Sequence, residues 1–217
     1  MRTVVFDLDG TLVDSAADIR ASVNKMLAEE GYRELDLPTV ISFIGNGLPV
    51  LVQRVMAHFQ IEETEFPRLS ARVLAIYNAS TSAHTVIYDG AREVLDALQA
   101  KGVRMAVCTN KPKEPAMHVL EDLDLIQYFD AVVGGDSFEK RKPDPLPLLK
   151  IIGETPKQDV LYVGDSEVDA ETAQRAGVTF ALFTKGYRKS PVESIPHDRP
   201  FSSWREFLSL VEDVSSE

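Results

Sequence analysis

The feature that most constrains the fold is a short buried strand at the start of the chain, with no partner strand near it in the sequence. Residues 3–6 are Thr, Val, Val and Phe, and such a β-branched and aromatic run favours a buried strand. The next strand-like segments lie beyond residue 85, because the stretch between them has the apolar spacing of helices. The first strand must therefore pair with strands that follow a helical insertion.

The stretch from about residue 15 to residue 80 is predicted to be all-helical. Ser15, with Asp18 three residues later, predicts a capping box at the start of the first helix. Apolar residues then share one helical face as far as Gly31, and two later segments repeat this spacing. The apolar positions are Ile19, Val23, Met26 and Leu27, then Leu48, Leu51, Val52, Val55, Met56 and Phe59, then Leu69, Val73, Ile76 and Tyr77.

Beyond residue 85 the sequence alternates between helical and strand-like segments. This order predicts the α/β class, with a mostly parallel sheet flanked by helices. The helical insertion would sit over the strand ends as a cap, so we predict a core of residues 1–14 and 82–217 and a cap of residues 15–81. The predicted helices are 93–100, 115–123, 146–152, 167–175 and 204–211, and the predicted strands are 103–108, 131–133, 160–163 and 179–183.

Polar residues follow three of the predicted strands. Asp7 and Asp9 follow the first strand, Thr109 and Asn110 follow the second, and Asp165 follows a later one. In open parallel sheets, ligands bind in the crevice outside the carboxyl ends of the strands. We therefore expect these side chains to gather at one site.

The acidic residues of this group indicate a magnesium site. Asp7 and Asp9 can face a common site only if the chain turns at once, which Gly10 allows. Two carboxylates so close repel each other unless a cation or a shared proton relieves them, and Asp165 with Asp169 offers further oxygen ligands. Mg²⁺ prefers such ligands, whereas the four histidines and the single cysteine have no zinc-ligand spacing.

The same residues fit phosphoryl transfer. The Asp7 carboxylate could attack phosphorus if the charge of the phosphoryl group is neutralised, and Lys142 supplies a positive charge for this. Thr109 could donate its hydroxyl and its backbone N–H to a phosphoryl oxygen, near the start of a helix that attracts anions. Asp9 could protonate the leaving alkoxide and then remove a proton from the hydrolytic water.

Four segments, DLDGTLVDS, CTNKP, RKPDP and GDSEVD, occur in the order of the four motifs of the haloacid dehalogenase-like hydrolase superfamily. The chain resembles this family nearly from end to end. The resemblance implies a Rossmann-like core with a small α-helical cap inserted after the first motif. It implies that Asp7 is the nucleophile and a metal ligand, and that Asp9 is the general acid and base and ligates the metal through its backbone carbonyl.

The later motifs extend the implied site. Asp165 matches the third metal ligand, and Asp169 matches the outer acidic residue that orients the ligands of the metal. Asp169 could also stabilise the first turn of its helix. Thr109 and Lys142 match the phosphate-binding residues.

The cap segments FIGNGLPVLVQRV and YNASTSAHTVIYDGAREVLDAL are similar to those of the phosphoglycolate phosphatases. The loop formed by Gly45, Asn46 and Gly47 resembles the substrate-specificity loop of the family, which reaches the leaving group when the cap closes. We expect this loop and Asn110 to contact substrate. The resemblance implies a Mg²⁺-dependent phosphomonoester hydrolase, acting on phosphoglycolate through an aspartyl-phosphate intermediate.

Other functions share part of this pattern. A sugar-phosphate, nucleotide or pyrophosphate phosphatase and a phosphomutase carry the same four motifs, so these alternatives stay open. A dehalogenase needs no carboxylate at the position of Asp9, and a phosphonate-cleaving relative would need a cap lysine, for which Lys25 is the candidate. Outside the enzymes, a receiver-like phosphoacceptor domain lacks the helical insertion, and a catalytically silent binding protein would not need intact motifs.

Charge and composition exclude further classes. The formal net charge of -11 disfavours binding to nucleic acid or to anionic lipid, which depends on clustered Lys and Arg. No segment approaches the roughly 20 apolar residues that cross a bilayer. Cys108 is the single cysteine and is expected in the core, so no intramolecular disulfide forms and a cytoplasmic location is expected. The expected partner is a small phosphorylated metabolite, bound by a monomer or a homodimer.

Overall fold

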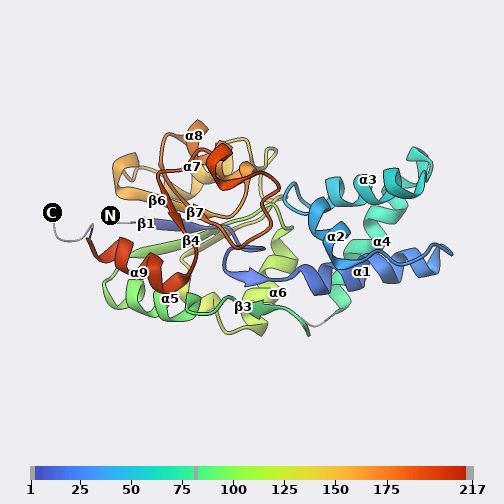
Figure 1. The fold of residues 1–217 in the computed structure, drawn as a ribbon, viewed down its shortest axis with the longest axis horizontal. Helices are drawn as coiled ribbons and strands as arrows, with labels where there is room; N and C mark the ends of the chain where they lie inside the picture. Colours follow the sequence, from blue (N-terminus) through green and yellow to red (C-terminus); the bar gives the residue numbers. More distant parts are fainter. Residues whose placement is uncertain (1–2, 81–82, 214–217) are drawn as a thin grey trace.

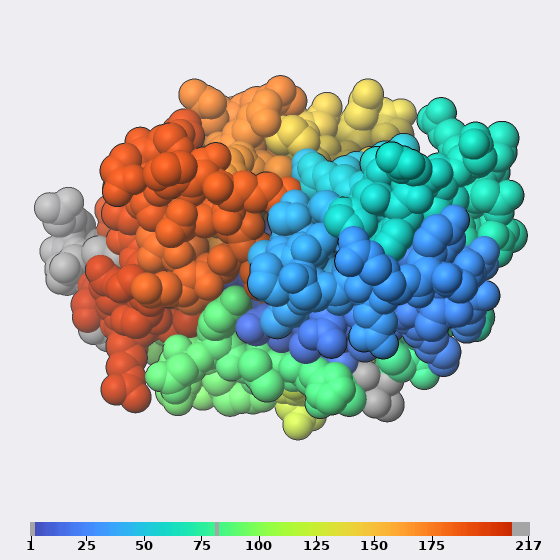
Figure 2. All heavy atoms as spheres, turned by 45° about the vertical axis from the view of Figure 1, so that its right-hand side comes forward, coloured from blue at the N-terminus to red at the C-terminus, as the bar shows by residue number. Residues whose placement is uncertain are grey.

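A computed structural model of the chain describes residues 3–80 and 83–213. Figure 1 shows two bodies along the long axis of the molecule, one with a central sheet and one made only of helices. The two bodies pack directly against each other on the face that Figure 2 presents, where the N-terminal helices (blue) meet the later part of the chain (orange). Within the described residues, no helix is both long and apolar enough to span a membrane.

The central sheet has six parallel strands in the order β5-β4-β1-β6-β7-β8. The first strand lies in the middle, between β4 and β6. This confirms that its partners come from beyond the helical insertion, and it confirms the predicted parallel sheet. The strands are β1 (Thr3–Phe6), β4 (Arg104–Cys108), β5 (Ala131–Val133), β6 (Val160–Gly164), β7 (Thr179–Phe183) and β8 (Arg199–Phe201).

Helices cover both faces of this sheet. Because side chains alternate along a strand, Val4 and Phe6 of β1 point into one apolar cluster and Val5 into another. The first cluster includes α5, α6 and α9, and the second includes α7 and α8. Cys108 is buried in the second cluster, as predicted. The helices are α5 (Ala91–Ala100), α6 (Lys113–Asp122), α7 (Leu146–Ile152), α8 (Glu167–Ala176) and α9 (Trp204–Asp213), with 3₁₀ turns at Ile126–Tyr128, Lys157–Asp159 and Val192–Ser194.

The second body, here called the helical body, consists of α1 to α4 and has an apolar core of its own. The predicted apolar stripes supply that core, which includes Val23, Leu27, Val52, Val55 and Val73. The helices are α1 (Ala16–Glu29), α2 (Leu37–Phe43), α3 (Leu48–Phe59) and α4 (Phe66–Ala79), with a 3₁₀ turn at Glu63–Glu65.

The predicted capping box at the start of α1 is wrong. The Ser15 side chain makes no cap hydrogen bond, because its hydroxyl instead donates to the Asp9 carboxylate at 2.5 Å. Asp18 accepts hydrogen bonds from the His84 backbone N–H and from the Thr85 hydroxyl at 2.6 Å. Both side chains thus form hydrogen bonds to other segments of the chain instead of capping α1.

Two short strands that the sequence did not predict connect the bodies. β2 (Val13–Asp14) pairs antiparallel with β3 (Val86–Ile87), so the chain leaves the core and returns to it at one place. Strands of two residues have no measurable periodicity, which explains why they were missed. The edge strand β8 was also missed, because Pro200 disfavours a strand except at an edge. The predicted boundary between residues 81 and 82 lies outside the described residues.

Candidate active site

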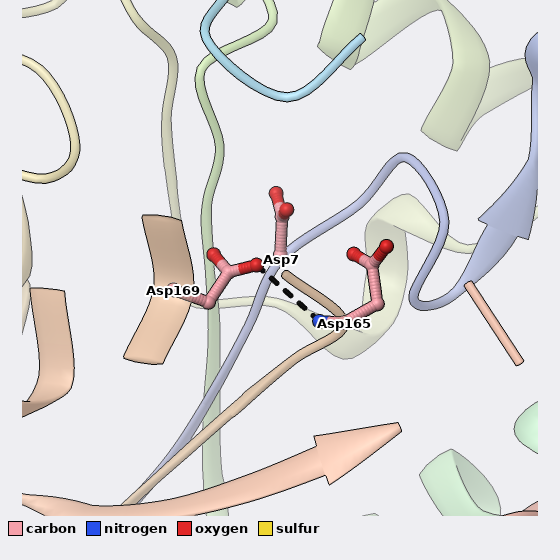
Figure 3. Close-up of side chains that lie close together, drawn as sticks. All are labelled: Asp7, Asp165 and Asp169. Carbon is pink, nitrogen blue, oxygen red and sulfur yellow. Dashed lines mark hydrogen bonds between the residues drawn. The ribbon is translucent and has the colours of Figure 1, made fainter. Parts of the chain in front are cut away.

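Three carboxylates meet at the carboxyl end of the sheet. Asp7 follows β1 and Asp165 follows the neighbouring strand β6, so parallel pairing brings them together. Asp169 joins them from the first turn of α8. Each offers an oxygen atom, and these atoms lie within 4.8 Å of one another, in buried surroundings (Figure 3). We call these three residues the carboxylate cluster.

Two glycines let the chain approach this closely. Gly10 has φ +84°, and a Cβ atom there would lie 2.5 Å from Asp165 Oδ2. At Gly164 a Cβ atom would lie 2.4 Å from the Asp169 side chain. Any other residue at either position would push a carboxylate out of the cluster.

Asp169 is held by hydrogen bonds on both of its oxygens. Oδ2 accepts from the Ser166 hydroxyl at 2.6 Å and from the backbone N–H groups of Ser166 and Asp165, the latter drawn as a dashed line in Figure 3. Ser166 and Asp169 thereby form the capping box of α8. Oδ1 accepts from Lys142 at 2.7 Å and from the Tyr162 hydroxyl at 2.8 Å. The side chain is therefore fixed by protein donors alone.

Lys142 supplies the positive charge of the cluster. Its Nζ lies 2.7 Å from Asp169 and 3.0 Å from Asp7 Oδ1, and it hydrogen-bonds to the Tyr162 hydroxyl at 2.9 Å. Burial alone would lower the pKa of Lys142, but the neighbouring Asp169 and Asp7 carboxylates outweigh burial and raise it. The ammonium therefore stays charged.

One ammonium does not neutralise three carboxylates. Burial raises the pKa of Asp7 to about 7, although Lys142 acts in the opposite direction. Burial, followed by repulsion from Asp169 and Asp7, raises the pKa of Asp165 well above its usual value. For Asp169, burial opposes ionisation, but Lys142 and the hydrogen bonds from Ser166 and Tyr162 hold its pKa below the usual value. The cluster thus lacks positive charge.

The Asp9 side chain lies outside the carboxylate cluster. Its carboxylate forms an ion pair with Lys111, whose Nζ is 2.9 Å from Oδ1 and 3.1 Å from Oδ2, and it accepts the Ser15 hydroxyl. Asp7 and Asp9 therefore each have their own lysine, instead of repelling each other without compensation. Both carboxylates still border the same cavity.

Thr109 and Asn110 lie beside this pair, as predicted, but one expected donor is not free. The Thr109 backbone N–H donates to Val133 at 2.9 Å, which extends the pairing of β4 with β5, so the expectation that it binds phosphate is wrong. Thr109 borders the cavity, and its hydroxyl oxygen accepts the Lys111 backbone N–H at 3.2 Å. The Asn110 side-chain amide donates to the backbone carbonyls of Lys142 and Gly45 at 3.0 and 3.1 Å.

The loop of Gly45, Asn46 and Gly47 comes from the helical body and lies against the core. A Cβ atom at Gly47 would come within 2.9 Å of the Asn110 carbonyl oxygen, so the contact is close. A cavity remains between this loop and the strand ends. Besides Asp7, Asp9, Thr109, Asn110 and Lys111, it is bordered mainly by apolar side chains of both bodies, namely Ile44, Leu48, Leu51, Leu74, Pro112 and Pro115.

Comparison with known proteins places this site in a family. The sequence model described as haloacid dehalogenase-like hydrolase matches residues 4–183. The chain belongs to the haloacid dehalogenase-like hydrolase family. This match spans all four motifs and therefore includes every residue of the carboxylate cluster.

Several relatives of this haloacid dehalogenase-like hydrolase are named phosphoglycolate phosphatase. One from Cereibacter sphaeroides is 48% identical over 97% of this chain and 98% of its own. Another, from Rhodobacter capsulatus, is 38% identical over 96% of each chain. Among solved structures, a predicted phosphoglycolate phosphatase from Haemophilus somnus aligns with a TM-score of 0.91 and 30% identity, over 97% of this chain and 98% of the other. The enzyme class of this family member is that of a phosphatase.

The site of this hydrolase also contains residues that the sequence analysis did not identify. Lys111 is one, although it stands two positions after Thr109 in the second motif. Tyr187 is another, because its backbone N–H donates to Asp165 Oδ2 at 2.5 Å. Thr11 donates its hydroxyl to the other oxygen of Asp165 at 2.9 Å. Lys25, the cap lysine of the phosphonate-cleaving alternative, is exposed on α1 and does not border the cavity.

Proposed function

We propose that this phosphatase hydrolyses phosphoglycolate, with Asp7 as the nucleophile and Mg²⁺ as the cofactor. The observation that carries the proposal is the carboxylate cluster, where three carboxylates are buried together and two of them, Asp7 and Asp169, share one ammonium. Asp7 also borders the cavity between the two bodies. The substrate follows from the relatives named phosphoglycolate phosphatase, which align over nearly the whole chain.

The carboxylate cluster fits a magnesium ion. Its donors are all oxygens. Burial, together with repulsion from neighbouring carboxylates, raises the pKa values of Asp7 and Asp165, and a divalent cation would favour their ionised forms. We propose Asp7, Asp165 and the Asp9 backbone carbonyl as direct ligands. Asp169 would orient the ligand set from outside, because each of its oxygens already accepts more than one protein donor and Oδ1 pairs with the Lys142 ammonium. Each Asp165 oxygen accepts a single neutral donor, from Thr11 or Tyr187. When bound, the ion would offset the negative charge of the phosphoryl group.

Asp7 is suited to attack phosphorus. Its Oδ1 accepts the Leu8 backbone N–H at 2.7 Å and faces Lys142, so the carboxylate is oriented by one of its oxygens. Oδ2 would form the new bond to phosphorus while the bond to the glycolate oxygen breaks. Lys142 and the Thr109 hydroxyl would bind phosphoryl oxygens, which positions the group for this transfer.

Asp9 would act as the general acid in the first step and as the general base in the second. In the first step it would donate a proton to the departing glycolate oxygen, and in the second it would take a proton from the water that attacks the aspartyl phosphate. The hydrolysis releases inorganic phosphate and restores the Asp7 carboxylate. Ser15 and Lys111 hold the Asp9 carboxylate in place for this role.

The helical body would act as a cap. Residues 15–81 would close over the strand ends and exclude water while the phosphoryl group is transferred. Contacts between the two bodies support this role, since Asn110 in the core donates to Gly45 in the loop of the helical body. Gly45, Asn46 and Gly47 would contact the leaving group.

The proposal is tested with purified protein and a panel of phosphate esters. Phosphoglycolate, sugar phosphates, nucleotides and pyrophosphate are compared at equal concentration, with Mg²⁺ and with EDTA. We expect Mg²⁺-dependent phosphate release, fastest with phosphoglycolate. Equal or faster release from another ester would contradict the substrate, and undiminished release in EDTA would contradict the metal.

A further inference from the structure

Lys111 is the charged group for which the proposed chemistry has no use beyond holding Asp9. Its side chain is 5% exposed and borders the cavity between the two bodies. Among the described residues that border this cavity, it is the single cation. Burying an ammonium is costly unless it meets anions or other acceptors, so its position needs an explanation.

The surroundings of Lys111 keep it charged and give it one partner that is neutral. Burial alone would lower the pKa of Lys111, but Asp9 and Tyr77 outweigh this and raise it. An ammonium has three N–H donors, and the two oxygens of Asp9 engage at most two of them. The Nζ atom also lies 4.4 Å from the centre of the Tyr77 ring, on α4 of the helical body. Tyr77 also contributes a side-chain hydrogen bond to this ammonium. A substrate carboxylate could replace this neutral partner and form a stronger, ionic hydrogen bond.

Phosphoglycolate has a second anionic group, a carboxylate, which the residues proposed to bind phosphate do not bind. Its carboxylate is one carbon away from the ester oxygen, so it must lie on the leaving-group side of the phosphoryl group. Lys142 does not border this cavity, and the proposed mechanism assigns its ammonium to the phosphoryl oxygens. The remaining lining on the leaving-group side is mainly apolar, which would leave a carboxylate without a partner there.

We propose that Lys111 binds the substrate carboxylate and thereby determines the preference for an anionic leaving group. This inference rests on the proposed function, because it assumes phosphoryl transfer at Asp7. The Lys111 ammonium donates to the carboxylate while it retains Asp9, so one side chain positions the acid and the leaving group it protonates. Because Tyr77 lies on α4, the helical body borders the place where the carboxylate would bind.

Two other cations near the site are less suited to this role. The Arg54 guanidinium donates to the Phe43 carbonyl and to the Asn46 side chain at 2.8 and 2.9 Å, so it supports the loop of the helical body. Lys189 borders an adjoining hollow on the Asp165 side, which has Asp7, Asp9, Ile44 and Gly45 in common with this cavity. There the Glu167 carboxylate interacts with the Lys189 ammonium. Neither borders the cavity that contains Lys111.

The test compares two substrates that differ in the carboxylate alone. Phosphoglycolate and 2-hydroxyethyl phosphate have leaving groups of similar length, and the second carries no charge on that side. The measured quantity is the ratio of their kcat/KM values in wild type, Lys111→Met and the matched control Lys113→Met. Lys113 is exposed and lies two residues after Lys111, at the start of α6. Any general effect of Lys111 on Asp9 acts on both substrates and cancels in the ratio.

We expect Lys111→Met to lower this ratio by about 30- to 100-fold, mainly through KM for phosphoglycolate, as loss of an ionic hydrogen bond predicts. Lys113→Met should keep the wild-type ratio. If both substrates slow equally in Lys111→Met, the residue positions Asp9 alone and the inference is wrong. Lys111→Arg, which keeps the charge, gives a second measurement if the Met variant does not fold, and it should retain most of the preference.

The same assay separates failure of the inference from failure of the proposed function. A wild-type enzyme that does not prefer phosphoglycolate over 2-hydroxyethyl phosphate would overturn the proposed substrate. A wild-type enzyme with a clear preference that survives in Lys111→Met would overturn the role of Lys111 and leave the proposed function intact.

Discussion

The strand ends of the core and the surface of the helical body use charge in opposite ways. In the core, the Lys142 ammonium lies 3.0 Å from Asp7 and 2.7 Å from Asp169, and all three side chains are buried. On the helical body, Arg72 pairs with Glu29 at 2.5 Å, but both side chains are more than one-third exposed. Buried charge costs folding free energy, whereas exposed pairs contribute little to it. We attribute the buried charges of the core to the metal ion and phosphoryl group that we propose bind there.

The largest expected effect is on the rate when the nucleophile is lost. Asp7→Asn should lower kcat by about 10⁴-fold or more, because an amide cannot form the aspartyl phosphate. The rate of phosphate release is measured under saturating substrate and Mg²⁺. Glu139→Gln, at an exposed position, is the control for loss of a negative charge. Wild-type turnover in Asp7→Asn would refute the mechanism.

Removing the metal should nearly abolish activity as well. EDTA treatment is expected to reduce kcat by about 10³-fold or more, since the phosphoryl charge is no longer offset, and added Mg²⁺ should restore it. Binding is also measured without turnover, because a ligand that binds only the folded state raises Tm. Mg²⁺ should raise the Tm of wild type and fail to do so in Asp165→Asn. An equal increase in both proteins would place the ion elsewhere.

Replacing the buried Lys142 should lower the stability of the folded protein. Lys142→Met leaves the Asp7 and Asp169 carboxylates without their shared partner, which should cost about 3 to 5 kcal/mol of unfolding free energy. Urea denaturation of the metal-free protein measures this. Lys150→Met, on the exposed side of α7, should leave stability nearly unchanged. A loss below about 1 kcal/mol in Lys142→Met would mean that the cluster does not depend on this ammonium.

The shortage of positive charge in the core should make metal-free stability depend on pH. The pKa of Asp7 rises from 3.8 to about 7 in the folded protein. Between these values the folded state keeps a proton that the unfolded chain releases, so this residue makes stability fall as pH rises. Asp7→Asn cannot titrate there, so its Tm advantage over wild type should grow from pH 4 to pH 7. Thermal unfolding in EDTA measures the difference, and a constant offset would argue against the raised pKa.

The smallest effect is expected on the helical body. Arg72→Met breaks an exposed ion pair with Glu29 and should shift Tm by no more than about 2 °C, with no change in kcat. Differential scanning calorimetry and the phosphatase assay check both. If Arg72→Met destabilised the protein as much as Lys142→Met, the proposed difference between the buried charges of the core and the exposed ion pairs of the helical body would be wrong.

The sequence predicted the elements that have a repeating or compositional signal. The bounds of β1 agree with the prediction, because a short β-branched run that ends at Asp7 has little freedom. The gathering of Asp7 and Asp165 could also be predicted, since both follow parallel strands. Asp169 and Lys142 were predicted as an oxygen ligand and a positive charge, and the motifs supported both; the structure brings them together at 2.7 Å.

Other features depend on contacts with other segments of the chain, which no pattern in the local sequence indicates. Lys111 is buried because Asp9 and Tyr77 approach it from segments far away in the chain, and nothing in its own neighbourhood indicates that burial. Ser15 had two possible partners, the end of its helix and Asp9, and only packing decides between them. The backbone N–H of Thr109 was expected to be free, but β4 continues its pairing by one residue.

The paired segments β2 and β3 have a further consequence for how such enzymes can diversify. Since Val13–Asp14 and Val86–Ile87 lie side by side, the helical body is attached as a branch at a single junction. Residues between them can change in size or arrangement without altering the order of strands in the sheet. The residues that recognise the substrate and the residues that break the phosphate ester can therefore evolve separately, because they lie in different parts of the sequence.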